Sequence, residues 1–156
     1  MIQSVKPAPT DETDGLPMPK RIWAVISVGF ALCMSVLDVN IINIVLPTLS
    51  HDFGTSPAVT TWIINGYQLA IVVSLLSFSA LGEIIGYRKV YLSGIGLFCI
   101  TSLICALSDS FWTLTIARIF QGFSASAITS VNTAQLRYIY PKGQLGRGMG
   151  INAMVV

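Results

Sequence analysis

Charged side chains are scarce in this chain of 156 residues, where Lys, Arg, Asp and Glu together make up only 10% of the sequence. Soluble domains carry roughly 25% charged residues, so this chain has too little charge to cover a surface that faces water. Hydrophobic residues make up 53% of it, and the mean hydropathy is +0.72. Because lipid cannot satisfy backbone polar groups, helices are the favoured way to cross it. We therefore expect an all-α membrane protein.

Several other features are missing, and each absence argues against a class of function. Basic residues occur singly or in pairs and the net charge is +2, so we expect no binding of nucleic acid. The three cysteines stand apart in apolar stretches, which argues against a zinc site and against a disulfide framework. P-loop and nucleophile motifs are absent. We therefore expect no enzymatic chemistry and no cofactor or metal.

Apolar segments divide the chain into a tail and a helix bundle. Residues 1–20 are rich in proline and acidic residues, a composition typical of disorder. A helix needs about 20 apolar residues to cross a bilayer, and four segments are suitable: residues 22–49, 59–81, 90–107 and 111–136. A fifth begins near Gly148. Residues 21–156 are therefore expected to form a partial transmembrane bundle, with four complete spans and the start of a fifth.

The positive charges predict how these spans are oriented. Lys20 and Arg21 precede the first span, and Arg88 and Lys89 lie between the second and the third. Three further cations follow the fourth span: Arg137, Lys142 and Arg147. The other two loops contain no Lys or Arg. Because cytoplasmic loops carry the excess of Lys and Arg, we expect a cytoplasmic N-terminal tail and a cytoplasmic loop at residues 82–89.

Asp38 is a carboxylate deep in the first span, where it costs about 2.5–3.5 kcal/mol on insertion scales. Asn40 and Asn43 lie on roughly the opposite face of that helix. We therefore expect the first span to be central, with protein or a cavity on both sides. Two interpretations of Asp38 stay open: a hydrogen-bond partner that holds helices together, or a site for a proton or a cationic substrate.

Arg118 is a second charge at membrane depth and lies in the fourth span. It belongs to a polar stripe on one helical face about 120° wide, made of Thr115, Arg118, Gln121, Gly122, Ala125, Thr129 and Asn132. Such a stripe lines an aqueous cavity or packs closely against a neighbouring helix. At about 1.5 Å per residue, Arg118 and Asp38 have similar depths in the outer half of the bilayer. A direct or water-bridged pair is therefore within reach.

The second span carries its own polar face, formed by Thr61, Asn65 and Gln68. Hydrogen bonds between helices and the lining of a cavity are equally good interpretations of this face.

The loop between the second and third spans resembles a motif of a known family. Residues 79–89 read SALGEIIGYRK, which is similar to the cytoplasmic loop motif G-x-L-a-D-R-x-G-R-K of the major facilitator superfamily. Gly86, Arg88 and Lys89 match the motif, and Glu83 stands where the family has Asp. The family's loop latches the two halves of a transporter together. The resemblance therefore implies a conformational latch formed by Glu83, Gly86, Arg88 and Lys89.

Two further stretches resemble drug:proton antiporters of that superfamily, especially its fourteen-span branch. Residues 37–47, LDVNIINIVLP, are similar to the helix-one signature L-D-x-T-x-x-N-x-A-L-P, and RIFQG at residues 118–122 matches R-x-x-Q-G of helix four. The resemblance implies the N-terminal part of a major-facilitator bundle in the plasma membrane, which is the inner membrane of a bacterium. It also implies that Asp38, Arg118 and Gln121 couple transport to a proton. The expected lining of the transport cavity is Asn40, Asn43, Asn65, Gln68 and Gly122.

The function implied by this resemblance is proton-coupled efflux of lipophilic or cationic drugs by alternating access. The helix-five motif of these antiporters would lie just beyond Val156, so we expect further helices of the same protein as partners, besides lipid, proton and a small-molecule substrate. Two alternatives stay open. One is a self-contained four-helix multidrug exporter that acts as a dimer, and the other is a non-transporting membrane scaffold or assembly protein.

Overall fold

The computed structural model describes residues 17–140 and 142–153. Its elements in chain order are α1 (Met18–Asp52), α2 (Pro57–Thr60), α3 (Trp62–Ile85), α4 (Tyr87–Ala106), α5 (Phe111–Ile139), the short 3-10 helix η1 (Lys142–Gln144) and α6 (Leu145–Ala153). These described residues include no β-strand. Residues 1–16, which make up most of the predicted disordered tail, lie outside them.

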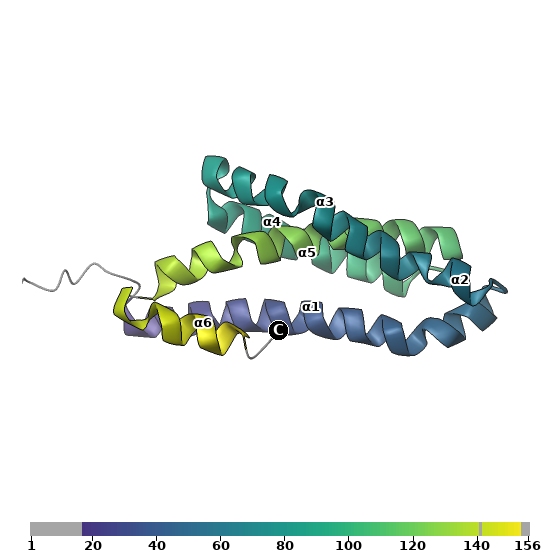
Figure 1. Cartoon of the computed structure of the whole chain (residues 1–156), viewed down its shortest axis with the longest axis horizontal. Helices are drawn as coiled ribbons and strands as arrows, with labels where there is room; N and C mark the ends of the chain where they lie inside the picture. The colour runs from purple at the N-terminus through teal and green to yellow at the C-terminus, as the bar shows by residue number, and fades with distance from the viewer. Residues whose placement is uncertain (1–16, 141, 154–156) are drawn as a thin grey trace, which may run out of the picture.

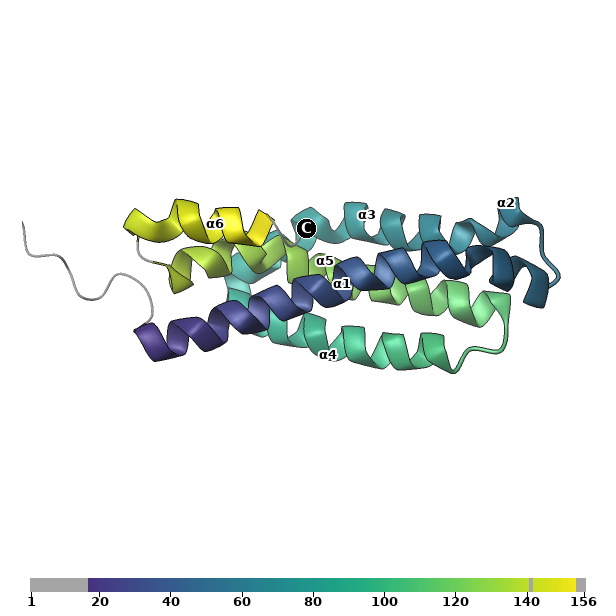
Figure 2. The same cartoon turned by 90° about the horizontal axis from the view of Figure 1, so that it is seen from below.

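The long helices run side by side as an elongated antiparallel bundle (Figure 1). Helices α3, α4 and α5 pack against one another, and α1 lies over α5 with α3 and α4 on either side (Figure 2). The start of α1, the α3–α4 junction and the α5–α6 junction lie at one end of the bundle. The α1–α2 and α4–α5 turns lie at the other. The described helices therefore gather the basic junctions at a single end.

Local sequence signals explain where several helices begin and end. Ser56 caps α2 and Ser110 caps α5, each accepting a hydrogen bond from the backbone N–H three residues later, as helix-capping serines commonly do. Between α3 and α4 the chain turns at Gly86, which has a φ of 100°. Residues other than glycine rarely adopt such a φ, because their Cβ atom clashes with the backbone. A glycine at this position therefore lets one helix end and the next begin without a longer loop.

Helix α5 supplies most of the buried interior. Its small residues Ser124, Ala125 and Ser126 are almost completely buried, and Gly94 of α4 approaches α5 closely beside Ala127. Small side chains let helix backbones approach one another. The bundle is therefore held together around α5 by close contacts between backbones as well as by apolar packing.

Three described segments are long and apolar enough to cross a membrane: Pro19–Asp52, Pro57–Ile85 and Tyr87–Ala106. Helix α5, which contains the whole predicted fourth span, is not among them. Its polar side chains explain this difference, because Thr115, Arg118, Gln121 and Asn132 lower the hydropathy of the helix. All four are buried.

The expectation that the first span is central is not met among the described residues. Helix α1 exposes large apolar side chains such as Phe30, Leu37 and Ile44, whereas α5 has neighbouring helices on several sides. The central helix of this part of the chain is therefore α5. The polar residues on opposite faces of α1 have separate partners. Asp38 pairs with α5, and the amides of Asn40 and Asn43 donate to carbonyls of α1 itself.

Candidate functional site

Asp38 of α1 and Arg118 of α5 form an ion pair in the middle of the bundle. An Nη atom of Arg118 donates to Oδ2 of Asp38 at 2.7 Å, and the side chains of Arg118 and Asp38 are only 8% and 14% exposed. Nε2 of Gln121 donates to the other carboxylate oxygen, Oδ1, at 3.0 Å. Both oxygens of the Asp38 carboxylate are therefore bound by donors on a single neighbouring helix.

The spacing of the α5 residues produces this arrangement. Arg118 and Gln121 are three residues apart, so they project from the same face of the helix. Gln121 is completely buried, and its Oε1 accepts a hydrogen bond from the Cys105 thiol of α4 at 3.5 Å. That contact fixes the amide with its NH2 group toward Asp38. Cys105 is the member of this network that sequence reasoning missed, because an isolated cysteine in an apolar helix gives no signal of a polar partner.

One donor of the network has no acceptor within the part of the chain that the structure describes. Nε of Arg118 is buried and makes no hydrogen bond there. A buried donor without a partner costs about 1–3 kcal/mol. Both carboxylate oxygens of Asp38 therefore accept hydrogen bonds, whereas one buried nitrogen of Arg118 has no acceptor among the described residues.

Gly122 has a packing role, which corrects the expectation that it lines a cavity. A Cβ atom at this position would lie 2.5 Å from the Tyr67 carbonyl oxygen and 2.9 Å from Cβ of Ala70. Gly122 is thus a point of close approach between α5 and α3. This contact places the part of α5 next to Gln121 directly against α3.

Asn40, two residues from Asp38, borders a cavity. The cavity has a volume of about 240 Å³ and is lined by residues of α1, α3 and α5: Leu32, Ser35, Val36, Val39, Asn40, Tyr67, Ile71, Ala125 and Thr129. Most of these side chains are apolar, and none carries a charge. The amide of Asn40 donates to the Val36 carbonyl of its own helix at 2.7 Å.

The other predicted lining residues lie elsewhere. Asn43 is exposed and donates to the Val39 carbonyl of its own helix at 3.1 Å. Asn65 and Gln68 are exposed on α3. The described helices therefore do not bring Asn43, Asn65 or Gln68 into a cavity with Asp38.

The predicted latch residues surround the α3–α4 junction. Glu83 lies in the last turn of α3, Gly86 forms the turn between the helices, and Arg88 and Lys89 lie in the first turn of α4. All four are exposed, and none of the ion pairs among the described residues involves them. The junction thus presents one acidic and two basic side chains outward.

The sequence matches the model of the Major Facilitator Superfamily over residues 28–156. The chain belongs to this superfamily. It is therefore part of a family of multi-pass membrane transporters, in agreement with the resemblance of its three motifs.

The chain is also similar to several curated transporters. The chain is 51% identical over 148 residues to an uncharacterized transporter of Escherichia coli, YebQ, a match that covers 95% of this chain and 32% of the relative. It is 32% identical to the riboflavin transporter RibZ of Clostridioides difficile, over 88% of this chain and 30% of the relative. It is also 32% identical to the drug efflux pump JefA of Mycobacterium tuberculosis, over 81% of this chain and 25% of the relative. The chain thus spans about a third or less of the length of these curated relatives.

Proposed function

We propose that this chain forms the proton-coupling part of an exporter for lipophilic or cationic drugs, with the N-terminus in the cytoplasm of a bacterial inner membrane. Asp38 is the group that binds and releases the proton, Arg118 is its counter-charge, and Gln121 orients it. The observation that carries this proposal is that both carboxylate oxygens of Asp38 are bound by Arg118 and Gln121 of α5.

The geometry suggests how a proton can move a helix. Asp38 in its charged form ties α1 to α5 through a charge-assisted bond and an amide bond, and charge-assisted bonds are roughly twice as strong as neutral ones. Protonation removes the charge and with it much of this attraction. Helix α1 is also joined to α4 through the Tyr91 hydroxyl, which donates to the Ser27 carbonyl at 3.2 Å. Gain or loss of a proton at Asp38 therefore favours different positions of α1 against α5, as alternating access requires.

The local chemistry also separates proton binding from substrate binding. A cationic substrate would have to displace Arg118 or Gln121 before it could reach the Asp38 carboxylate. The neighbouring cavity is lined by apolar and neutral polar side chains, which suit the lipophilic part of a substrate. We therefore assign Asp38 to the proton and the cavity beside Asn40 to the substrate. The names of relatives such as the drug efflux pump of Mycobacterium tuberculosis support export of drugs.

The scaffold alternative explains less of the structure. It accounts for close helix contacts at Gly122 and Gly94, but a scaffold has no need of a buried ion pair with an unsatisfied Arg118 nitrogen. Membership of the Major Facilitator Superfamily also argues against a self-contained four-helix exporter.

Drug efflux from cells tests this proposal. The transporter that contains this chain is produced at its full length in a strain deprived of its own exporters, and release of a fluorescent lipophilic cation is followed. Asp38→Asn is expected to abolish energised efflux, while Asp52→Asn, an exposed carboxylate at the end of α1, leaves it intact. Equal efflux by both variants at equal membrane abundance would refute the role of Asp38.

A further inference from the structure

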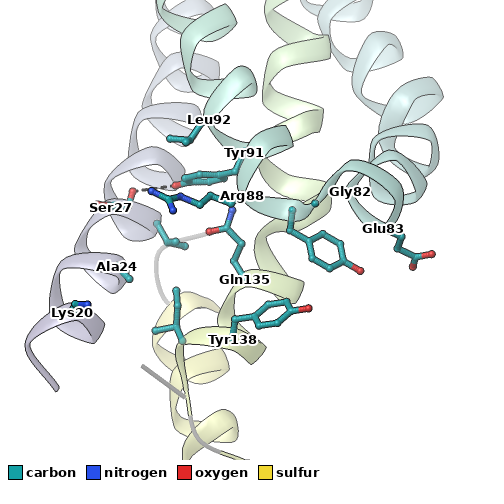
Figure 3. A pocket seen from close by; sticks show the side chains of 14 residues that line it. Lys20, Ala24, Ser27, Gly82, Glu83, Arg88, Tyr91, Leu92, Gln135 and Tyr138 are labelled. Carbon is teal, nitrogen blue, oxygen red and sulfur yellow. Dashed lines mark hydrogen bonds between the residues drawn. The ribbon is translucent and has the colours of Figure 1, made fainter. Parts of the chain in front are cut away.

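A large cleft opens at the basic end of the bundle, well away from the Asp38 site (Figure 3). Its volume is about 880 Å³, and it lies between the first turns of α1, the α3–α4 junction and the last turns of α5. Val28 is the α1 residue of the cleft that comes nearest to Asp38 in sequence, and ten residues of helix span about 15 Å. The cleft is therefore separate from the ion pair and its neighbouring cavity.

Two cations and two helix N-termini face this cleft. Lys20 and Arg88 line it, and neither takes part in the ion pairs of the described residues. Lys20 lies in the first turn of α1 and Arg88 in the first turn of α4, and neither helix has a side-chain cap or an acidic residue in that turn. The helix dipole makes such termini favourable for anions. Positive charge thus converges on the cleft from two helices.

The other polar groups of the cleft are compatible with an anion. Nε2 of Gln135 is a buried donor with no acceptor in the part of the chain that the structure describes, and Gln135 lines the cleft. Figure 3 shows Arg88 extending toward Ser27 of α1, whereas the Glu83 side chain points away from α1. The carboxylate at the edge of the cleft therefore does not neutralise its basic wall.

Apolar side chains line the cleft next to its cations. Ala24 and Val28 follow Lys20 along α1, and Leu92 follows Arg88 along α4. Leu92 is exposed, and Tyr138 lies exposed beside the mouth, where aromatic residues often meet lipid headgroups. A ligand that fits these cations and apolar side chains has an anionic head and an apolar tail.

We propose that this cleft binds an anionic phospholipid, with its phosphate between Lys20 and Arg88 and its acyl chains along the apolar groove of α1 and α4. Basic pockets between transmembrane helices on the cytoplasmic side are suited to such headgroups. Charge complementarity favours this occupant over a further apolar helix of the same protein, which would leave the two cations and the Gln135 amide without partners. The proposal concerns a site apart from proton coupling and does not depend on it.

Native mass spectrometry of the full-length transporter in neutral detergent tests the proposal. Phosphatidylglycerol, which is anionic, and phosphatidylcholine, which is zwitterionic, are titrated separately. The wild type is expected to retain phosphatidylglycerol preferentially. Removing one cation near a membrane surface weakens anionic lipid binding about fivefold, so Lys20→Gln with Arg88→Gln should weaken it roughly 25-fold. The matched control is Arg137→Gln, an exposed cation at the same end of the bundle that does not line the cleft, and it should change binding less than twofold.

Two further measurements, together with the titrations above, separate the alternatives. The charge-conserving pair Lys20→Arg and Arg88→Lys should retain the lipid, which distinguishes lost charge from lost folding. Equal retention of the two lipids would overturn the proposal. The same would follow if Arg137→Gln weakened phosphatidylglycerol binding as much as the double Gln variant, because the basic end would then attract anionic lipid in general. Displacement of phosphatidylglycerol by millimolar inorganic phosphate would also overturn it, because the site would then recognise a free anion. Unchanged binding in the double Gln variant would overturn the proposal as well, because the lipid would then bind without these two cations.

Discussion

The Asp38 carboxylate of α1 accepts a hydrogen bond of 2.7 Å from Arg118 of α5, although the two residues are 80 positions apart in the chain. The pair is almost fully enclosed, so water contributes little to either charge. Each residue is thus the main electrostatic partner of the other. This ion pair ties α1 to α5.

Removing Arg118 should destabilise the transporter more than removing both charges. Loss of one partner from a buried ion pair costs about 3–5 kcal/mol, because the other charge stays buried without compensation. We expect Arg118→Ala to lower the thermal unfolding temperature in detergent, and Asp38→Asn combined with Arg118→Gln to recover part of the loss. Unfolding followed by tryptophan fluorescence measures both variants. A double variant that is less stable than Arg118→Ala would show that the two side chains are not coupled.

Gly122 and Gly96 provide a matched pair for helix packing. A Cβ atom at Gly122 would lie 2.5 Å from a backbone oxygen of α3, whereas nothing lies within 4 Å of one at Gly96. We expect Gly122→Ala to destabilise the bundle by about 1–3 kcal/mol through overpacking. Gly96→Ala should be neutral or stabilise α4 by up to about 1 kcal/mol, since alanine is the better helix former. Equal effects on unfolding would contradict the close contact between α3 and α5.

Gly86 should tolerate no side chain at the α3–α4 turn. Its φ of 100° is a conformation that costs other residues about 1–3 kcal/mol. Gly86→Ala is therefore expected to lower stability and to slow transport, because the turn carries the proposed latch residues. Gly146→Ala, at an open position of α6, serves as the control. Protease sensitivity of the α3–α4 junction in membrane vesicles reports the local change, and wild-type sensitivity in Gly86→Ala would refute the constraint.

Cys105 should act through Gln121 and not through the substrate. Its thiol donates to Gln121 Oε1, and loss of one such bond is worth about 0.5–1.5 kcal/mol. We expect Cys105→Ala to reduce proton-driven transport severalfold and Cys105→Ser, which keeps a donor, to restore most of it. Cys33→Ala, an exposed cysteine of α1, should have no effect. A selective change in the KM for substrate in Cys105→Ala would contradict a positioning role.

The helical architecture and the membership of the superfamily were predictable from sequence because both depend on local patterns. Long apolar runs and sparse charge predict helices in lipid, and the residues around Asp38, Arg118 and Gly86 carry the three family motifs. The proximity of Asp38 and Arg118 also followed from their similar depths, since few charges at membrane depth are available to pair. The roles assigned to these residues stay predictions.

The packing around these residues was not predictable in the same way. Which face of α1 meets α5 depends on how the helices rotate about their axes, and the sequence does not specify this rotation. For that reason Asn43, Asn65 and Gln68 were expected in a cavity but lie exposed in the described bundle. Gly122 was assigned to a cavity because helix faces that line a cavity and helix faces that pack closely both contain small residues. Only the approach of the Tyr67 carbonyl shows that Gly122 packs against α3. Cys105 was missed because its partner lies on another helix.

The most direct test of the account compares two transport modes in proteoliposomes that contain the full-length protein. One mode is accumulation of a labelled lipophilic cation driven by a proton gradient, and the other is exchange of labelled for unlabelled substrate without a gradient. If Asp38 carries the coupling proton, Asp38→Asn will lose gradient-driven accumulation and the accompanying proton flux but retain exchange. Accumulation and proton flux at wild-type levels in Asp38→Asn would contradict the assignment of proton coupling to this residue.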